Sequence, residues 1–163
     1  MPEATAAITY RRATLEDADA ILGIFNRAKA HSLPWLPKVH TAEEDRWWVA
    51  NKLIPETEVT LALRDGEPVG LCALSKTMIE QLYIDPTAHR QGIGRRFVAD
   101  AKLKRPAGFR LYCFVQNEPA VAFYRSQGLV VIAEGDGSGN EEGLPDLLFE
   151  WQPQPFGFTD QIL

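Results

Sequence analysis

The chain has 163 residues, of which 45% are hydrophobic and 24% charged, and its net charge is -5. This length predicts one globular domain. A net negative charge disfavours nucleic acid as a partner, because binding phosphate needs accumulated positive charge. The sequence has neither a signal peptide nor an apolar run of about eighteen residues, so we expect a cytoplasmic protein with no membrane partner.

The residue types that often bind metals are few and scattered. Cys72 and Cys113 lie far apart in apolar segments, which predicts buried thiols in a reducing compartment and no disulfide. His31 and His40 are not spaced as metal ligands and no cysteine accompanies them. We therefore predict no metal.

The first half of the chain predicts one strand, two helices and a hairpin. A capping box of Thr41 and Glu44 opens the second helix, which is expected to stop before Pro55. Alternating apolar residues on either side of Asp65-Gly66 indicate a hairpin. The predicted elements are a strand at 8–12, a helix at about 15–30, a loop at 31–40, the second helix, and strands at 59–63 and 69–74.

The second half adds four strands and two helices. Asn117 is expected to cap the last helix, which ends at Gly128. The predicted elements are strands at 79–84, 109–115, 129–133 and 144–151, with helices at 93–105 and 118–127. The strand at 109–115 is predicted to be buried on both faces. The fold class is α/β (α+β), a single mixed and mostly antiparallel sheet flanked by helices, with a domain at 1–152 and a C-terminal tail at 153–163.

Charge is unevenly distributed along the second half. Six basic residues gather in one run, which comprises Arg90, Arg95, Arg96, Lys102, Lys104 and Arg105. Acidic residues gather between Glu134 and Asp146. One region suits an anion and the other a cation, although solvated surface explains such runs equally well.

A glycine-rich turn stands between the strand at 79–84 and the helix that follows it. Its residues Arg90 to Gly94 are expected to turn their backbone amides outward at a helix N-terminus, where a diphosphate would bind. Side chains at 92 or 94 would hold such a ligand away. A plain glycine turn is the alternative. Phe97 replaces the third glycine of a dinucleotide fingerprint, and the lysine of a phosphate-binding loop is missing.

Together these segments resemble a known family. Residues 82–86 and 91–94, followed by 117–120 and 123–129, are similar to the acetyl-coenzyme A binding core of the GNAT N-acyltransferase superfamily. The resemblance extends from about Ile8 to Trp151. It implies acetyl-CoA as co-substrate and an amine as acceptor. Exposed strand edges and an apolar tail favour a homodimer.

The resemblance implies a role for each matching residue. The pyrophosphate would be held by amides of the turn, whose residues are His89, Arg90, Gln91, Gly92, Ile93, Gly94 and Arg95. His89 stands where the family usually has Arg or Gln. The strand residues Leu82, Tyr83 and Ile84 would bind the pantetheine arm through their backbone. Asn117 would lie near that arm and Tyr124 near the thioester sulfur.

The chemistry requires a base for the amine and a proton donor for the leaving thiolate. Tyr124 is the expected acid, with core packing as its alternative. Glu80 is the expected base, with a solvated carboxylate as its alternative. A strand amide near Leu82 would polarise the carbonyl oxygen.

The loops at 33–40 and 135–146 are expected to frame the acceptor. Trp35, His40 and Trp47 would wall the pocket, although core packing explains tryptophans equally well. Glu141, Glu142 and Asp146 would attract a cationic amine.

The sequence thus predicts an N-acetyltransferase that moves an acetyl group to a primary amine of a small molecule or peptide, by direct attack in a ternary complex. A non-catalytic acyl-CoA sensor of the same fold is the alternative. A nucleotide-phosphate binder would instead bind ATP more tightly than coenzyme A.

Overall fold

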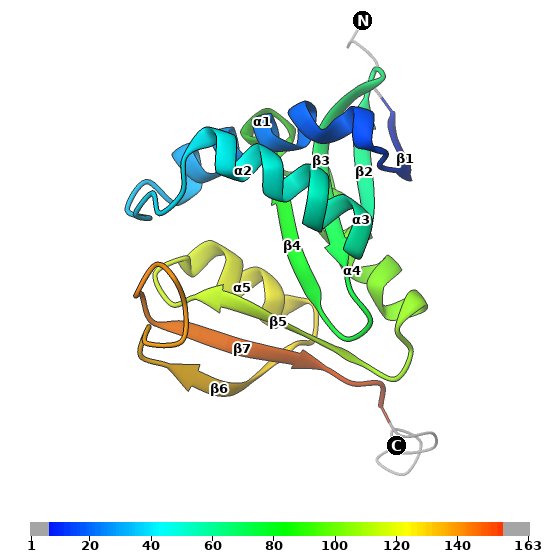
Figure 1. The fold of residues 1–163 in the computed structure, drawn as a ribbon. Coiled ribbons are helices and arrows are strands. Elements are labelled where there is room, and N and C mark those ends of the chain that lie inside the picture. Colours follow the sequence, from blue (N-terminus) through cyan, green and yellow to red (C-terminus); the bar gives the residue numbers. More distant parts are fainter. Residues whose placement is uncertain (1–6, 155–163) are drawn as a thin grey trace, which may run out of the picture.

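A computed structural model describes residues 7–154 of the chain (Figure 1). The predicted tail at 153–163 lies almost entirely outside this range. The helices are η1 (Leu15–Asp17), α1 (Ala18–Ser32), α2 (Ala42–Trp48), η2 (Val49–Leu53), α3 (Ile54–Glu56), η3 (Pro86–Ala88), α4 (Ile93–Lys104) and α5 (Glu118–Ser126). The strands are β1 (Ile8–Arg12), β2 (Glu58–Arg64), β3 (Glu67–Leu74), β4 (Ile79–Ile84), β5 (Phe109–Phe114), β6 (Val130–Gly135) and β7 (Asp146–Trp151).

The fold class is confirmed, but the strands form two sheets where one was expected. The first has the order β1-β2-β3-β4 and the second β5-β7-β6, and all the ladders are antiparallel. A single parallel bridge between Met78 and Arg110 joins them. Beyond this bridge β4 and β5 diverge (Figure 1). Within the described residues, β4 is therefore an edge strand of its sheet.

Helices cover both faces of the first sheet. Ile21, Ile24 and Phe25 of α1 pack with Leu61 and Leu71 on one face. On the other face, the buried side of α4 packs against β2, β3 and the inner face of the second sheet. Phe97 and Phe149 are among the largest fully buried side chains of this second core. The strands that flank the splayed region thus rest on one continuous apolar core.

The second helical segment continues past the residue at which it was expected to end. Between α2 and α3 the backbone widens into the π-helical turn η2, where the amide of Ile54 bonds to the carbonyl of Val49. Pro55 then occupies the first turn of α3, where its missing N–H has no role. The prediction of a stop before Pro55 was wrong because the π-helical turn shifts the bonding pattern ahead of the proline.

The prediction that the strand at 109–115 is buried on both faces was also wrong. Phe109, Leu111 and Cys113 of β5 are buried, whereas Arg110 and Tyr112 are exposed. The inner residues pack in the α4 core. The outer face has no helix over it in the part of the chain that the structure describes (Figure 1).

Asp17 joins β1 to the start of α1. Its carboxylate accepts two hydrogen bonds from Arg11, at 2.8 and 2.9 Å, and one from the amide of Thr14. The hydrogen bonds from Arg11 lower the pKa of Asp17 to about 2, against burial, which raises it. This carboxylate is ionised throughout the neutral range, and its interactions stabilise the native state.

Replacing Asp17 by Asn is expected to lower the free energy of unfolding at pH 7 by about 1–2 kcal/mol. Because the folded pKa lies below the ordinary value, this contribution is complete above about pH 4 and disappears as the pH falls toward 2. Urea unfolding of both proteins at pH 7 and pH 2.5 measures the difference. Asp19→Asn, which removes an exposed pair with Arg46, should change little. If Asp17→Asn lowered the free energy of unfolding by the same amount at both pH values, the ionised carboxylate would not be the stabilising group.

Candidate active site

A cleft of about 1580 Å³ opens where the two sheets diverge. Its floor is formed by β4 and β5, and its ends by α1, the β4–α4 turn, α5 and the β6–β7 loop. The residues that were predicted from the sequence to bind the cofactor line this cleft together, with the exception of Gln91. Those that line the cleft are Leu82, Tyr83, Ile84, His89, Arg90, Gly92, Ile93, Gly94, Arg95, Asn117 and Tyr124.

The turn before α4 has an unusual backbone. Arg90 and Gly92 have positive φ angles of 63° and 78°, and such pairs create concave rows of amides. Within residues 7–154, no hydrogen bond is formed by the backbone amides of Arg90 through Arg95. The amides belong to the N-terminus of α4, which carries a partial positive charge. A row of unbonded amides with this charge matches the oxygens of a diphosphate.

The structure favours glycine at the two positions of the turn for different physical reasons. A side chain at Gly92 would meet open space, and its positive φ is what requires glycine. At Gly94, a Cβ atom would stand 3.1 Å from Cζ of Phe123. Gly94 therefore has a packing role that the sequence did not predict, beside the predicted one of leaving room for a ligand. Gly94 allows α4 to pack closely on α5.

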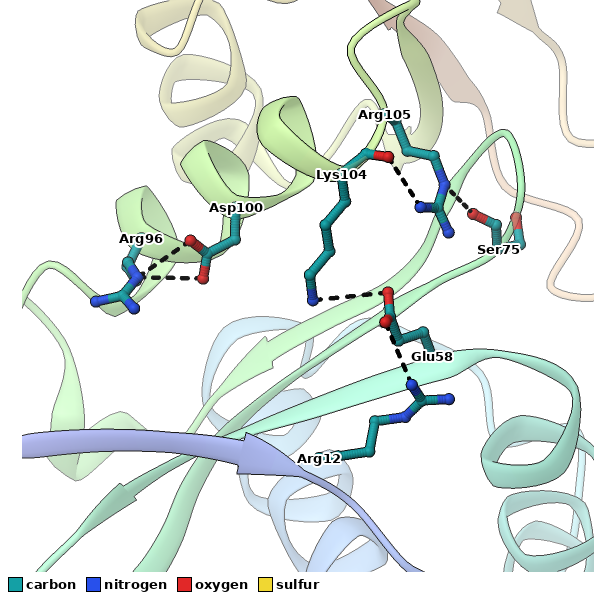
Figure 2. A network of polar contacts seen from close by, with 7 residues as sticks. All are labelled: Arg12, Glu58, Ser75, Arg96, Asp100, Lys104 and Arg105. Carbon is teal, nitrogen blue, oxygen red and sulfur yellow. Dashed lines mark hydrogen bonds and ion pairs between the residues drawn. The ribbon is translucent and has the colours of Figure 1, made fainter.

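Most of the basic run is bonded within the protein (Figure 2). Arg96 pairs with Asp100, Lys104 with Glu58, and Arg105 donates to the carbonyl of Ser75. Lys102 donates to the carbonyl of Gln127. In contrast, Arg90 and Arg95 line the cleft beside the unbonded amides. The basic run therefore stabilises α4, and only its first two residues are placed to meet an anion.

Asp85 anchors the segment that leads into the turn. It is 5% exposed, and its carboxylate accepts hydrogen bonds from Arg27 of α1 and from the amide and hydroxyl of Thr87. Arg64 of β2 in turn donates to Thr87. Although burial raises the pKa of Asp85, hydrogen bonds from Thr87 and Arg27 outweigh burial and lower the pKa overall. This network fixes the end of β4 relative to α1.

Asp85→Asn is expected to weaken coenzyme A binding about three- to tenfold, because the charged bonds that hold the turn are lost. The KM for the acceptor should stay unchanged. Calorimetric titration with coenzyme A, together with acceptor kinetics at saturating acetyl-CoA, measures this division. Asp100→Asn removes a carboxylate from the outer side of α4 and is the matched control. A loss of stability with unchanged coenzyme A affinity would show that Asp85 has no effect on the turn.

Tyr124 lies on α5 and faces the same cleft. It is 8% exposed, and its hydroxyl forms no hydrogen bond with any group of the described range. Burial raises the pKa of Tyr124, and the nearby Cys113, Cys72 and Tyr83 add to this effect. The phenol therefore stays neutral at physiological pH and remains able to donate a proton or a hydrogen bond.

Glu80, at the start of β4, also lines the cleft. Its side chain is exposed and forms no hydrogen bond or ion pair within the described residues. A carboxylate in this position is accessible to water and to an incoming amine.

The acceptor residues expected from the two loops separate into two groups. Glu142 and Asp146 line the cleft. Trp35, His40, Trp47 and Glu141 are not among its lining residues. Trp35 packs edge-on against Phe114 of β5, with ring centroids 5.9 Å apart. His40 bonds to Glu141 at 2.7 Å, so these two residues tie the α1–α2 loop to the β6–β7 loop. They support the frame of the site.

Other cleft residues were missed by the sequence reasoning. The main examples are Lys29, Cys113 and Phe123, whose positions depend on how α1, β5 and α5 meet. The alternating pattern of β5 was the one available signal, because it places Cys113 on the inner face. Asn117 lines the cleft and occupies the predicted N-cap position of α5, but its side chain forms no capping hydrogen bond.

The described part of the chain holds no group of three His, Cys, Asp or Glu side chains placed to bind a metal ion. Cys72 and Cys113 are free and buried, as predicted. Among the helices within 7–154, none combines the length and apolar character needed to cross a bilayer.

Comparison with known proteins gives a consistent result. A family model described as an acetyltransferase (GNAT) domain matches residues 55–130. The peptidyl-lysine N-acetyltransferase YjaB of Salmonella typhimurium is 30% identical over 145 residues, which are 87% of this chain and 98% of the relative.

Solved structures agree with this match. The apo form of YjaB from Escherichia coli superimposes with a TM-score of 0.74 at 26% identity, over 89% of this chain and 97% of that one. PaiA N-acetyltransferase from Thermoplasma acidophilum, solved with coenzyme A, has a TM-score of 0.70 at 19% identity, over 90% and 99% of the two chains. The second likeness shows the fold alone. Sequence and structure together establish that this chain belongs to the GNAT family of acetyltransferases.

Proposed function

We propose that this enzyme transfers the acetyl group of acetyl-CoA to the side-chain amine of a lysine in a peptide or protein. The observation that carries the proposal is that one cleft contains both the unbonded amides of Arg90 to Arg95 and the hydroxyl of Tyr124. The lysine acceptor follows from the name of the relative in Salmonella typhimurium.

The chain has a group for each part of the co-substrate. The amides before α4, with Arg90 and Arg95, would hold the diphosphate. Because β4 pairs with β3 alone in the part of the chain that the structure describes, its other edge would offer backbone groups of Leu82 and its neighbours to an extended pantetheine arm. The arm would then lead from the diphosphate toward Tyr124.

The reaction needs two proton movements. Glu80 would accept a proton from the lysine amine, directly or through one water molecule, because only the neutral amine is a nucleophile. The nitrogen then bonds to the acetyl carbon while the carbon–sulfur bond breaks. Tyr124 would donate its proton to the departing sulfur, and a strand amide near Leu82 would bind the carbonyl oxygen. The new amide nitrogen then gives up its surplus proton, directly or through water, and this proton restores the Tyr124 phenol. No residue of the chain becomes covalently acetylated in this sequence.

The test is incubation with acetyl-CoA and lysine-containing peptides, with release of free thiol and peptide mass followed together. We expect equal amounts of thiol and acetylated lysine. Binding of coenzyme A without transfer to any peptide or small amine would favour a non-catalytic sensor. Tighter binding of ATP than of coenzyme A would exclude both functions.

Glu80→Gln is expected to lower kcat about 100-fold at pH 7.5, the usual size of a general-base contribution. The loss should shrink near pH 10, since roughly a quarter of a lysine amine with a pKa of about 10.4 is then neutral without help, against about a thousandth at pH 7.5. Glu67→Gln, an exposed change on the β2–β3 hairpin, is the control. A loss that stays constant from pH 7.5 to pH 10 would assign the base to another group.

A further inference from the structure

The two ends of the cleft carry opposite charge. Its basic side chains come from the end of α1 and the β4–α4 turn, and they are Lys29, His31, His89, Arg90 and Arg95. Its acidic side chains on the opposite side all come from the β6–β7 hairpin: Glu134, Asp136, Glu142 and Asp146. We call this second set the acidic rim. The proposed co-substrate accounts for the basic end, but not for the acidic rim.

The carboxylates of the acidic rim lack cationic partners. None of them forms an ion pair with another of residues 7–154. Other acids of the same hairpin are paired, since Glu150 bonds to Arg110 and Glu141 to His40. Asn140 orients Asp146 through a neutral hydrogen bond of 3.2 Å. Like charges held together in this way repel one another unless a cation joins them.

A second and independent feature points to a ligand at this side of the cleft. Tyr124 is 8% exposed, lines the cleft and, as described above, has no hydrogen-bond partner within the described residues. No side-chain polar atom of the described residues is both fully buried and without a partner, so the hydroxyl reaches the cleft and can bond to a molecule held there. Tyr83 and Glu142 of the acidic rim line the same cleft, and burial and, next, the charge of Glu142 raise the pKa of Tyr83 to about 12. The acidic rim thus borders the reacting end of the cleft.

The reacting amine cannot by itself neutralise the acidic rim. It must be uncharged when it attacks the thioester, so a positive charge that persists through the reaction has to come from elsewhere on the acceptor. Lysine and arginine side chains beside the modified lysine keep their charge at neutral pH. They would lie against the acidic rim while the reacting amine approaches Tyr124.

We propose that the acidic rim selects lysines that have a second basic residue close by in the same peptide. The proposal rests on the lysine acetyltransferase function proposed above. A peptide fits better than a free polyamine because Ala133 to Gly135 of β6 line the cleft. Within the described residues, β6 pairs with β7 alone. Its open edge offers backbone groups to an extended peptide, which a polyamine cannot use.

The experiment compares three peptides that differ only in the residues around one lysine: arginine, serine or glutamate. We expect kcat/KM for the arginine-flanked peptide to exceed that for the serine-flanked peptide about tenfold at low salt. Raising the salt concentration to about 0.5 M should remove most of this advantage. The double variant Glu134→Gln with Glu142→Gln should reduce the ratio between the two peptides to about two. Glu67→Gln removes one carboxylate outside the cleft and should leave the ratio of kcat/KM between the two peptides unchanged.

Several results would overturn the inference. Equal rates for the three peptides would show that the acidic rim does not select the acceptor, while the proposed function would stand. Faster acetylation of spermidine than of the arginine-flanked peptide would assign the acidic rim to a polyamine. The remaining case is a protein that binds the peptides but does not acetylate them. Calorimetric titration of the peptides into the complex of protein and coenzyme A detects this case. A preference for arginine in binding, without acetyl transfer, supports the inference and contradicts the proposed function.

Discussion

Tyr124→Phe is expected to lower kcat at least about 100-fold while the affinity for coenzyme A changes less than about twofold. The hydroxyl is the only group removed, and it has no hydrogen-bond partner among the residues described, while the Tyr124 residue is buried and lines the cleft. Removal of an unbonded hydroxyl leaves no other buried group unsatisfied, so the fold should not suffer. The departing sulfur, however, loses its proton donor. Steady-state kinetics with saturating co-substrate, together with calorimetry, measure the two effects.

Tyr10→Phe is the matched control for this change. Tyr10 lies on β1 beneath the guanidinium of Arg96, with 4.5 Å between that group and the ring centroid. Its loss of a hydroxyl should leave kcat unaltered. Unchanged turnover in Tyr124→Phe would transfer the acid role to another group, and Tyr83 would be examined next because it lines the same cleft.

Gly92→Ala is expected to weaken coenzyme A binding about five- to thirtyfold. A residue with a Cβ atom disfavours the left-handed backbone by about 1–2 kcal/mol, so the turn relaxes and its amides no longer point together. Binding then has to restore the native turn, and the affinity falls by the corresponding factor. Calorimetry gives this affinity, and thermal unfolding gives the accompanying loss of stability.

The chain offers a close control in Gly66. Its φ angle of 79° nearly equals the 78° of Gly92, and a Cβ atom would likewise meet open space. Gly66→Ala on the β2–β3 turn should therefore lower stability to a similar extent, without any effect on coenzyme A. Equal coenzyme A affinities in the two variants would show that the shape of the turn before α4 does not determine binding.

Local patterns in the sequence predicted most of the elements. Alternation around Asp65-Gly66 identified β2 and β3, and the residues at helical spacing from Ile93 onward identified α4. These patterns succeed because each element buries one continuous apolar face. The π-helical turn before Pro55 was not predictable in this way, since it depends on a change in backbone bonding that side-chain polarity does not encode.

The division of the sheet depends on contacts between distant residues. Nothing in β4 or β5 taken alone shows that they share only the bridge at Met78 and Arg110. The same limit applies to the site. The glycine-rich turn and Tyr124 were found from motifs, but Lys29 and Phe123 enter the cleft through tertiary packing. The packing role of Gly94 was missed for this reason, because the glycine accommodates the side chain of Phe123.

The acidic and basic runs show how charge patterns mislead when read along the chain. In sequence, the residues from Arg90 to Arg105 look like one anion site. In three dimensions, Arg96, Lys104 and Arg105 are bonded on the other side of α4 (Figure 2). The acidic rim, in contrast, is unpaired within the described range and faces the cleft. Pairing in the folded chain decides which charges are available to a ligand.

The central claim is that the main chain from Arg90 to Arg95 holds a diphosphate. Amide resonances of ¹⁵N-labelled protein, followed during titration with coenzyme A and with pantetheine, test it most directly. Coenzyme A should shift the resonances of these amides downfield and slow their hydrogen exchange, whereas pantetheine, which has no diphosphate, should leave them in place. Saturation with coenzyme A that leaves these amides unmoved, or equal shifts with pantetheine, would contradict the claim.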